Sequence, residues 1–296
     1  MTEAPTVFVL GNAGVDLSLA LAHLARPGET AVASAGVRAP GGKGLNQAVA
    51  AARAGARVRF CAAVGEDGEA DFVAQVLATE PLAGLRLLRR PEPTDISVVM
   101  VAADGENSIV SLCRCADTLD GAEAAAFAAG LAPADWLLMQ GNLTAAATLA
   151  AARAARGRVM LNAAPLRWPV APVLPLCAVA VVNRGEAKAI TGLTEPGDAA
   201  LWLRAQGCAA AVVTLGAEGC VWADADGPGR LPAAAARPVD TTGAGDTFCG
   251  VLAARLASGG ALPDALAAAQ QAAALSVTRF GAYAALPTAA ELSGLG

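Results

Sequence analysis

The sequence predicts an α/β fold with a mostly parallel central sheet that is covered by helices on both faces. Short apolar runs with strand character recur along the chain, and segments with helical periodicity separate most of them. This alternation is typical of βαβ units, whose parallel strands are buried on both faces. Apolar residues make up 55% of the 296 residues, enough for a large core, and no repeat or long linker divides them. We therefore expect a single domain over residues 1–296.

The strand- and helix-forming segments follow one another in a regular order. Residues 7–10 (VFVL) form a short apolar run that ends at Gly11, as expected of a buried strand entering a loop. A helix is predicted over residues 45–54, between a glycine cluster and Gly55, and a strand over residues 58–64. Further strands are predicted at 136–139, 159–161, 179–182 and 211–215, and helices at 246–257 and, as the last element, at about 263–277.

A β-hairpin interrupts this alternation. Residues 96–102 and 108–112 are rich in β-branched residues and flank residues 104–107 (DGEN), which are turn formers. We expect this hairpin to form a small β excursion outside the parallel sheet.

Composition excludes several classes of protein. The net charge of −5 argues against a nucleic-acid partner, because phosphate binding requires a basic surface. No run of eighteen apolar residues is present, so we expect no membrane span, and the start MTEAPTVFVLGN lacks the basic segment of a signal peptide. A cytoplasmic location is therefore expected.

Cysteine and histidine usage argues against metal-site, redox and hydrolase chemistry. The seven cysteines do not have the spacing of a zinc site or a redox pair, which favours buried, reduced thiols. His23 is the only histidine, and no nucleophile stands in a recognisable motif beside it. A Ser-His-Asp or Cys-His mechanism is thus disfavoured.

The most informative segment is residues 240–248 (DTTGAGDTF), which precede and open a predicted helix. Small residues there allow several backbone N–H groups to point at one spot near the helix N-terminus, a site suited to phosphate oxygens. Gly243 and Gly245 let the backbone approach a ligand without a Cβ in the way. Asp246 has two interpretations: it is either the N-cap of the helix or a functional carboxylate.

Four motifs together resemble the ribokinase-like (pfkB) carbohydrate kinases and are closest to the ribokinases. Residues 40–48 (PGGKGLNQA) resemble the N-terminal signature of that family, and residues 240–248 resemble its C-terminal signature. Between them, residues 183–186 (NRGE) are similar to its Asn-x-x-Glu motif, and residues 214–219 (TLGAEG) to its nucleotide loop. Other phosphate motifs fail: Gly44 stands where a Walker A loop has Ser or Thr, and no G-x-G-x-x-G follows the first strand.

The resemblance implies a ribokinase-like three-layer sandwich with a mostly parallel central sheet and a small β-sheet lid. The lid would consist of segments at about 13–38 and 96–113. In the family such a lid covers the sugar and often forms a dimer contact, so a homodimer through the lid is expected. Excluding water in this way protects ATP from hydrolysis.

The resemblance also assigns the catalytic residues. Asp246 would be the base that accepts the proton of the sugar hydroxyl as it attacks the γ-phosphate of ATP. The amides of Gly243, Ala244 and Gly245 would stabilise the charge on the transferring phosphoryl group. The implied reaction is transfer of the γ-phosphate to the terminal hydroxymethyl group of a pentose such as ribose.

Binding residues are implied in the same way. The ATP-binding set is Asn183, Glu186, Thr214, Gly216, Gly219, Gly245 and Gln270. The sugar-binding set is Asn12, Asp16, Gly41, Gly42, Lys43, Asn46, Asn142 and Asp246. Asn142 departs from the family pattern, because ribokinases usually carry a glutamate there that contacts the anomeric end of ribose.

Two cations are implied as well. Magnesium would be organised by Asn183 and Glu186, the latter through water, although these two residues could instead be a helix cap and an exposed first-turn acid. Potassium would lie beside the phosphate-handling loop. The matching positions are Asp240, Thr242, Ser276, Arg279, Gly281 and Ala285. Ala285 stands where a serine is common, which weakens the potassium assignment.

Two alternatives remain open from the sequence. A nucleoside kinase of the same fold, acting on adenosine or pseudouridine, would need a platform for a base, and the chain has only one tyrosine and six phenylalanines. A non-catalytic sugar-binding sensor would not need the intact Gly-Ala-Gly-Asp of residues 243–246.

Overall fold

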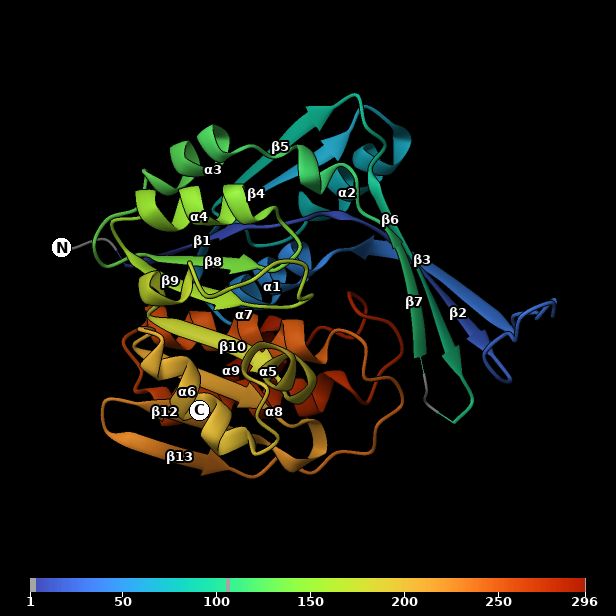
Figure 1. Ribbon diagram of the computed structural model, residues 1–296. Coiled ribbons are helices and arrows are strands. Elements are labelled where there is room, and N and C mark those ends of the chain that lie inside the picture. Colours follow the sequence, from blue (N-terminus) through green and yellow to red (C-terminus); the bar gives the residue numbers. More distant parts are fainter. Residues whose placement is uncertain (1–3, 105–106, 296) are drawn as a thin grey trace.

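A nine-stranded sheet forms the centre of the computed structural model, which describes residues 4–104 and 107–295. Its strand order is β13-β12-β11-β10-β9-β8-β1-β4-β5 (Figure 1). The strands are β1 Thr6–Leu10, β4 Arg57–Gly65, β5 Gly84–Arg90, β8 Trp136–Gln140, β9 Arg158–Asn162, β10 Val179–Asn183, β11 Ala210–Thr214, β12 Cys220–Asp224 and β13 Gly227–Leu231. Pairing is parallel from β5 to β11 and antiparallel through β12 and β13 at the other edge.

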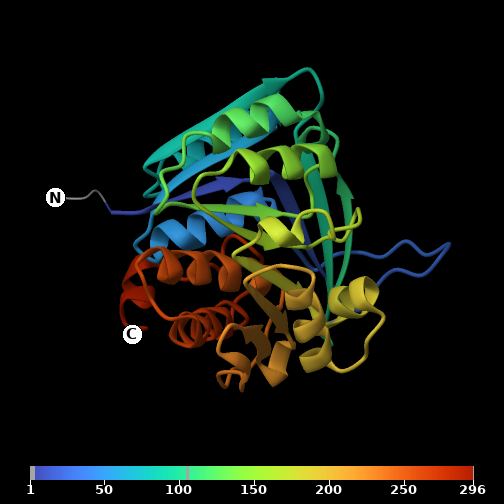
Figure 2. The ribbon, with the colours of Figure 1, turned by 60° about the vertical axis from the view of Figure 1, so that its left-hand side comes forward.

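The central strands are mostly apolar because both of their faces are covered. In β1, Val7 and Val9 belong to one hydrophobic cluster, whereas Phe8 and Leu10 belong to a second. Alternate residues of a strand point to opposite faces, and helices lie on both sides of the sheet (Figure 2). The helices are α1 Lys43–Arg53, α2 Gly68–Leu77, α3 Gly121–Ala128, α4 Ala145–Ala154, α5 Arg184–Thr191, α6 Pro196–Ala205, α7 Ala244–Ala257, α8 Leu262–Ser276 and α9 Ala289–Ser293, with 3₁₀ turns at Ala116–Thr118, Leu174–Leu176 and Gly216–Glu218.

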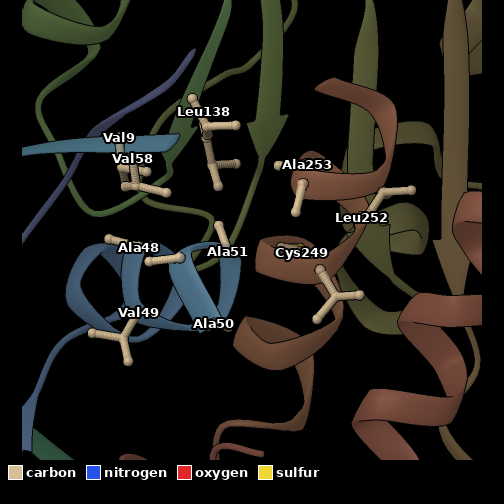
Figure 3. Close-up of a cluster of buried hydrophobic side chains, with 14 of the residues drawn as sticks. Val9, Ala48, Val49, Ala50, Ala51, Val58, Leu138, Cys249, Leu252 and Ala253 are labelled. Carbon is tan, nitrogen blue, oxygen red and sulfur yellow. The ribbon is translucent and has the colours of Figure 1, made fainter. Parts of the chain in front are cut away.

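Helices α1 and α7 pack closely on one face of the sheet, beneath β1, β4 and β8. Small side chains, among them Ala48 and Ala51 of α1 and Ala253 of α7, fill this contact together with Leu252 (Figure 3). A Cβ at Gly250 would lie 2.5 Å from the carbonyl oxygen of Gln47, so only glycine permits this approach. The small side chains and Gly250 thus let α1 and α7 lie close together.

A separate four-stranded sheet, with the order β3-β2-β6-β7, projects from the body of the molecule (Figure 1). Its strands are β2 Gly14–Leu21, β3 Ala35–Gly41, β6 Asp95–Ala102 and β7 Asn107–Leu112. The pairs β2–β3 and β6–β7 are antiparallel, and β2–β6 is parallel. We call this element the small sheet. It is formed by the two segments that the sequence predicts for it.

The predicted fold class is therefore confirmed, with several corrections in detail. The segment at 263–277 corresponds to α8, but it is not the last helix, because α9 follows at Ala289–Ser293. The antiparallel edge strands β12 and β13 and the helices α2 to α6 were not predicted individually. Of the predicted hairpin turn, Gly105 and Glu106 lie outside the described residues.

Candidate active site

Residues 240–243, in the segment predicted to handle phosphate, fold as a tight turn that leads directly into α7. The N-cap of this helix is Gly243, with φ of 78°, and no side chain caps the helix. A Cβ at Gly243 would lie 3.0 Å from the backbone of Ala282, so glycine is needed for both conformation and space. Of the first amides, Ala244 N–H points to the carbonyl of Thr241 at 3.3 Å. An uncapped N-terminus of a fourteen-residue helix is suited to bind an anion.

Asp246 is the third residue of α7, so the alternative that it is the N-cap is wrong. It is buried, with 5% exposure, and its Oδ1 accepts a 2.9 Å hydrogen bond from Gln47 Nε2. Lys43 Nζ lies 3.9 Å from the same oxygen, and the charge of Asp246 is the main cause that raises the lysine pKa. Because the Asp246 carboxylate lies beside a lysine and does not cap the helix, it can accept a proton from a ligand.

The residues predicted for the sugar meet where β1, β3 and α1 come together. Asn12 follows β1, Asp16 lies in β2, and Gly41 ends β3. A Cβ at Gly41 would lie 2.1 Å from Asp16 Cγ, and one at Gly42, whose φ is 101°, would lie 3.0 Å from Asn12 Nδ2. The two glycines therefore let the polar side chains of neighbouring strands converge.

Electrostatics link Asp16 to the same site. Burial, together with the charge of Asp246, raises the pKa of Asp16 to about 6. A hydrogen bond with Ser97 and the charge of Lys43 act in the opposite direction. The three charged groups therefore influence one another, as expected of groups that share one site.

Several buried amide atoms at this end of the sheet lack a partner among the described residues. They are Asn46 Oδ1 and both amide atoms of Asn142, with 2% and 4% exposure for the two residues. An unpaired buried amide costs about 1–3 kcal/mol, so such groups indicate a ligand that pairs with them. The backbone of Asn142 is held separately, because its carbonyl accepts a 2.7 Å hydrogen bond from Arg167 Nη1.

The residues predicted for the nucleotide lie at the carboxyl ends of β10 and β11. Asn183 and Thr214 are register partners in these parallel strands, and this edge is the usual ligand-binding edge of an open α/β sheet. Asn183 and Glu186 form a capping box in which each side chain accepts the other's backbone N–H at 2.8 Å. The capping alternative is thus present in the structure, while burial also raises the pKa of Glu186.

The remaining nucleotide residues differ in how they are placed. Gly216 and Gly219, with φ of 60° and 96°, enclose the 3₁₀ turn after β11. Gln270 is buried on α8. In the orientation that satisfies its amide, it donates to the Pro232 carbonyl at 2.8 Å and accepts from Cys220 N–H at 3.1 Å. Its predicted contact with adenine stays a prediction, because the structure shows its amide engaged with β12 and the segment after β13.

The predicted potassium residues surround the turn before α7. Both carboxylate oxygens of Asp240 accept hydrogen bonds. Oδ1 accepts from the backbone N–H of Thr242 at 2.9 Å and from its hydroxyl at 2.6 Å, and Oδ2 accepts from the backbone N–H of Gly281 at 2.9 Å. The Ser276 hydroxyl donates to Ala273, and Arg279 pairs with Glu291. Ala285 is fully buried. Asp240 thereby joins the 240–242 and 281 segments, whether or not a cation binds there.

Sequence reasoning missed a network of three buried amide side chains that adjoins the site, formed by Gln47, Gln140 and Asn162. Gln47 Nε2 donates to Asn162 Oδ1 at 3.0 Å as well as to Asp246, and Gln47 Oε1 accepts from Gln140 Nε2 at 2.9 Å. The available signal was a glutamine at the end of the apolar run WLLMQ and another inside the glycine motif. Such polar residues in buried elements generally have a partner or a function.

Comparison with known proteins decides the family. The model of the pfkB family carbohydrate kinases matches residues 4–289. The chain belongs to this family. A ribokinase of Haemophilus influenzae is 32% identical over 97% of this chain and 96% of that protein. Among solved structures, the ribokinase of Thermotoga maritima matches with a TM-score of 0.87 and a sequence identity of 26%. The ribokinase of Arabidopsis thaliana, in complex with ribose and ATP, matches with a TM-score of 0.85 and a sequence identity of 26%. Each match covers 99% of both chains.

Among the described residues of this kinase, no helix is long and apolar enough to cross a membrane. No group of three or more His, Cys, Asp and Glu side chains that could hold a metal ion occurs within residues 4–104 and 107–295.

Proposed function

We propose that this carbohydrate kinase transfers the γ-phosphate of ATP to the terminal hydroxymethyl group of a pentose such as ribose. The observation that carries the proposal is the placement of Asp246, buried in the first turn of an uncapped helix and close to Lys43. The ribokinases among the relatives, and a ribokinase structure that holds ribose and ATP, support a pentose as the acceptor. They do not favour a nucleoside kinase or a non-catalytic sensor.

In the proposed mechanism, Asp246 removes the proton from the sugar hydroxyl while the hydroxyl oxygen attacks the γ-phosphorus. The new P–O bond forms as the bond to the β-phosphate oxygen breaks, and ADP leaves. The backbone N–H groups of Gly243, Ala244 and Gly245 stabilise the negative charge on the transferring phosphoryl group. Asn12, Asp16, Lys43, Asn46 and Asn142 orient the sugar, and their hydrogen bonds with its hydroxyls pair the buried amides.

The residues at the nucleotide end suit a magnesium ion that is bound partly by the protein and partly by the phosphates of ATP. Glu186 offers a carboxylate there, and Asn183 and Thr214 lie side by side, but the described residues hold no closed set of acidic ligands. This donor set suits an ion that keeps several waters and binds mainly to phosphates. When bound, Mg²⁺ supplies positive charge that offsets the charge of the phosphates.

Potassium fits less well. The carboxylate of Asp240 and the hydroxyl of Ser276 already make hydrogen bonds within the protein, and Ala285 has no side-chain oxygen. A cation beside this loop would therefore be held mainly by backbone carbonyls, with Asp240 fixing the loop ends.

We further propose that the small sheet is a lid over the sugar and the contact of a homodimer. On the face of the small sheet opposite to Asp16, Val110 and Leu112 of β7 are 63% and 46% exposed. Burying such apolar side chains against a second copy of the chain would be favourable. Light scattering of wild type and a Val110→Asp variant tests this, and an unchanged mass would contradict it.

The chain would act as one domain over residues 1–296. A cytoplasmic location is supported by its seven cysteines, all of which are free thiols, as is usual in a reducing compartment.

Kinase activity against ribose, 2-deoxyribose, hexoses and nucleosides, measured by ADP release with sugar-free controls, tests the proposed function. We expect sugar-dependent ADP formation with a pentose. Activity with nucleosides alone, or no activity with any acceptor, would contradict the proposal.

A further inference from the structure

A chain of buried side-chain amides runs through the centre of the molecule to Asp246. Gln140 at the end of β8 donates to Gln47 of α1, and Gln47 donates both to Asn162 at the end of β9 and to Asp246 of α7. Gln47 and Gln140 have 0% exposure. Four elements that are distant in sequence are thus joined by three hydrogen bonds of 2.9–3.0 Å.

The direction of these hydrogen bonds is fixed by the carboxylate. An ionised Asp246 only accepts, so Gln47 must turn its NH₂ group towards it and its oxygen towards Gln140. Gln140 must then donate, and its own oxygen is left unpartnered among the described residues, against the backbone of Gly11. A buried carbonyl without a partner is unfavourable. Its presence indicates that the network is oriented to present an N–H to Asp246.

The surrounding backbone holds this geometry closely. Gly250, one turn after Asp246, permits α1 to approach, because a Cβ there would lie 2.5 Å from the Gln47 carbonyl oxygen. A Cβ at Gly11 would lie 2.1 Å from Gln140 Oε1. Gln47 therefore has little freedom to move away from the carboxylate that it contacts.

Both contacts with the carboxylate involve the same oxygen. Gln47 Nε2 lies 2.9 Å from Asp246 Oδ1, and Lys43 Nζ lies 3.9 Å from it. No hydrogen bond among the described residues involves Oδ2. The fixed Oδ1 thus leaves Oδ2 as the oxygen that can accept a proton from a substrate.

We propose that Gln47 is a positioning residue that fixes the rotation of the Asp246 carboxylate, so that Oδ2 faces the sugar hydroxyl. This inference rests on the proposed function, in which Asp246 is the base. Gln47 does not touch the reacting atoms, and it acts through the orientation of the carboxylate.

The first test compares two matched variants. Gln47→Met keeps the volume of the side chain but removes its hydrogen bond to Asp246. Gln140→Met removes the hydrogen bond between Gln140 and Gln47; Gln140 is as deeply buried as Gln47 but does not contact Asp246. We expect both variants to have a lower Tm. In Gln47→Met, kcat should fall about 10–100-fold while KM for the sugar changes little. In Gln140→Met, kcat should fall at most about three-fold. Equal kcat losses in the two variants, or a Gln47→Met enzyme within three-fold of wild type, would show a structural role only.

The second test uses Gln47→Glu, which keeps the shape and places a carboxyl beside Asp246. An ionised glutamate cannot donate a hydrogen bond to Asp246 Oδ1 and repels it, so kcat should fall at least as far as in Gln47→Met. A Gln47→Glu enzyme with the wild-type kcat would overturn the proposal.

Crystal structures of wild type and Gln47→Met provide a readout that does not depend on turnover. The proposal requires that the Asp246 carboxylate rotate or become disordered in the variant, and an unchanged carboxylate would overturn it. If wild type phosphorylates no sugar, the proposed function fails, while this comparison still decides whether Gln47 positions Asp246.

Discussion

The two ends of the site use polar residues in opposite ways. Near the small sheet, Asn46 and Asn142 are buried and keep amide atoms without partners among the described residues. At the ends of β10 and β11, Asn183 is exposed, and its side chain is satisfied by the capping box with Glu186. The first end gains hydrogen bonds only when a ligand arrives; in the proposed function this ligand is the sugar, and such a site would discriminate strongly between sugars. The side chains at the second end are satisfied without a ligand, so a nucleotide bound there as proposed would rely more on backbone groups and on charge.

The largest effect is expected from Asp246→Asn, which removes the base but keeps the size of the side chain. General-base catalysis contributes about 10²–10⁴-fold, so kcat should fall within that range while sugar binding and folding are nearly unchanged. Steady-state kinetics and calorimetric sugar binding measure the two quantities. A variant that keeps more than about a third of the wild-type kcat would refute the role of Asp246.

Glu186→Gln separates capping from metal binding at the nucleotide end. Glutamine preserves the capping box, so the free energy of unfolding should change little, but the loss of charge should raise the Mg²⁺ concentration needed for half-maximal activity about 10–100-fold. The matched control is Asn183→Ala, which breaks the cap and should cost about 0.5–2 kcal/mol of stability. Unchanged Mg²⁺ dependence in Glu186→Gln would leave Glu186 with the capping role alone.

Asn142→Glu tests discrimination at the sugar end. A neutral amide both donates and accepts, whereas a carboxylate only accepts, so wild type should not prefer ribose strongly and should favour a sugar altered at or near C1. The variant should shift the kcat/KM ratio towards ribose by about ten-fold. The prediction is wrong if wild type already favours ribose ten-fold over every other sugar and the variant changes nothing.

The pH dependence of sugar binding should report Asp16. Burial raises the pKa of Asp16 to about 6, so below that pH the carboxyl is protonated and loses the charge that would make it a strong acceptor for the sugar hydroxyls proposed to bind there. KM for the sugar should therefore rise as the pH falls through about 6, and Asp16→Asn should abolish this trend. The free energy of unfolding should depend on pH in the opposite direction. The folded state holds this proton more tightly than the unfolded state, so the contribution of Asp16 to stability falls as the pH rises from the ordinary aspartate pKa of 3.8 through about 6.

The smallest effect is expected from the monovalent cation. Replacing sodium by potassium at constant ionic strength should raise activity modestly, since Asp240 already links the loop ends through hydrogen bonds without a cation. Identical rates in the two salts would show that the loop operates without potassium, in line with the missing oxygen at Ala285.

By itself, the sequence determined the α/β class, most central strands and the segments of the small sheet, because apolar periodicity and turn residues are local signals. Its glycine motifs also located the phosphate turn and Asp246. Only the tertiary structure decided that Asp246 does not cap α7, that Asn183 and Glu186 do cap α5, and that Gln270 lies against β12. It alone revealed the link from Gln140 through Gln47 to Asp246, whose members lie 93 and 199 residues apart. Such contacts arise when strands and helices from distant parts of the chain pack together, and no local pattern encodes which side chains then meet.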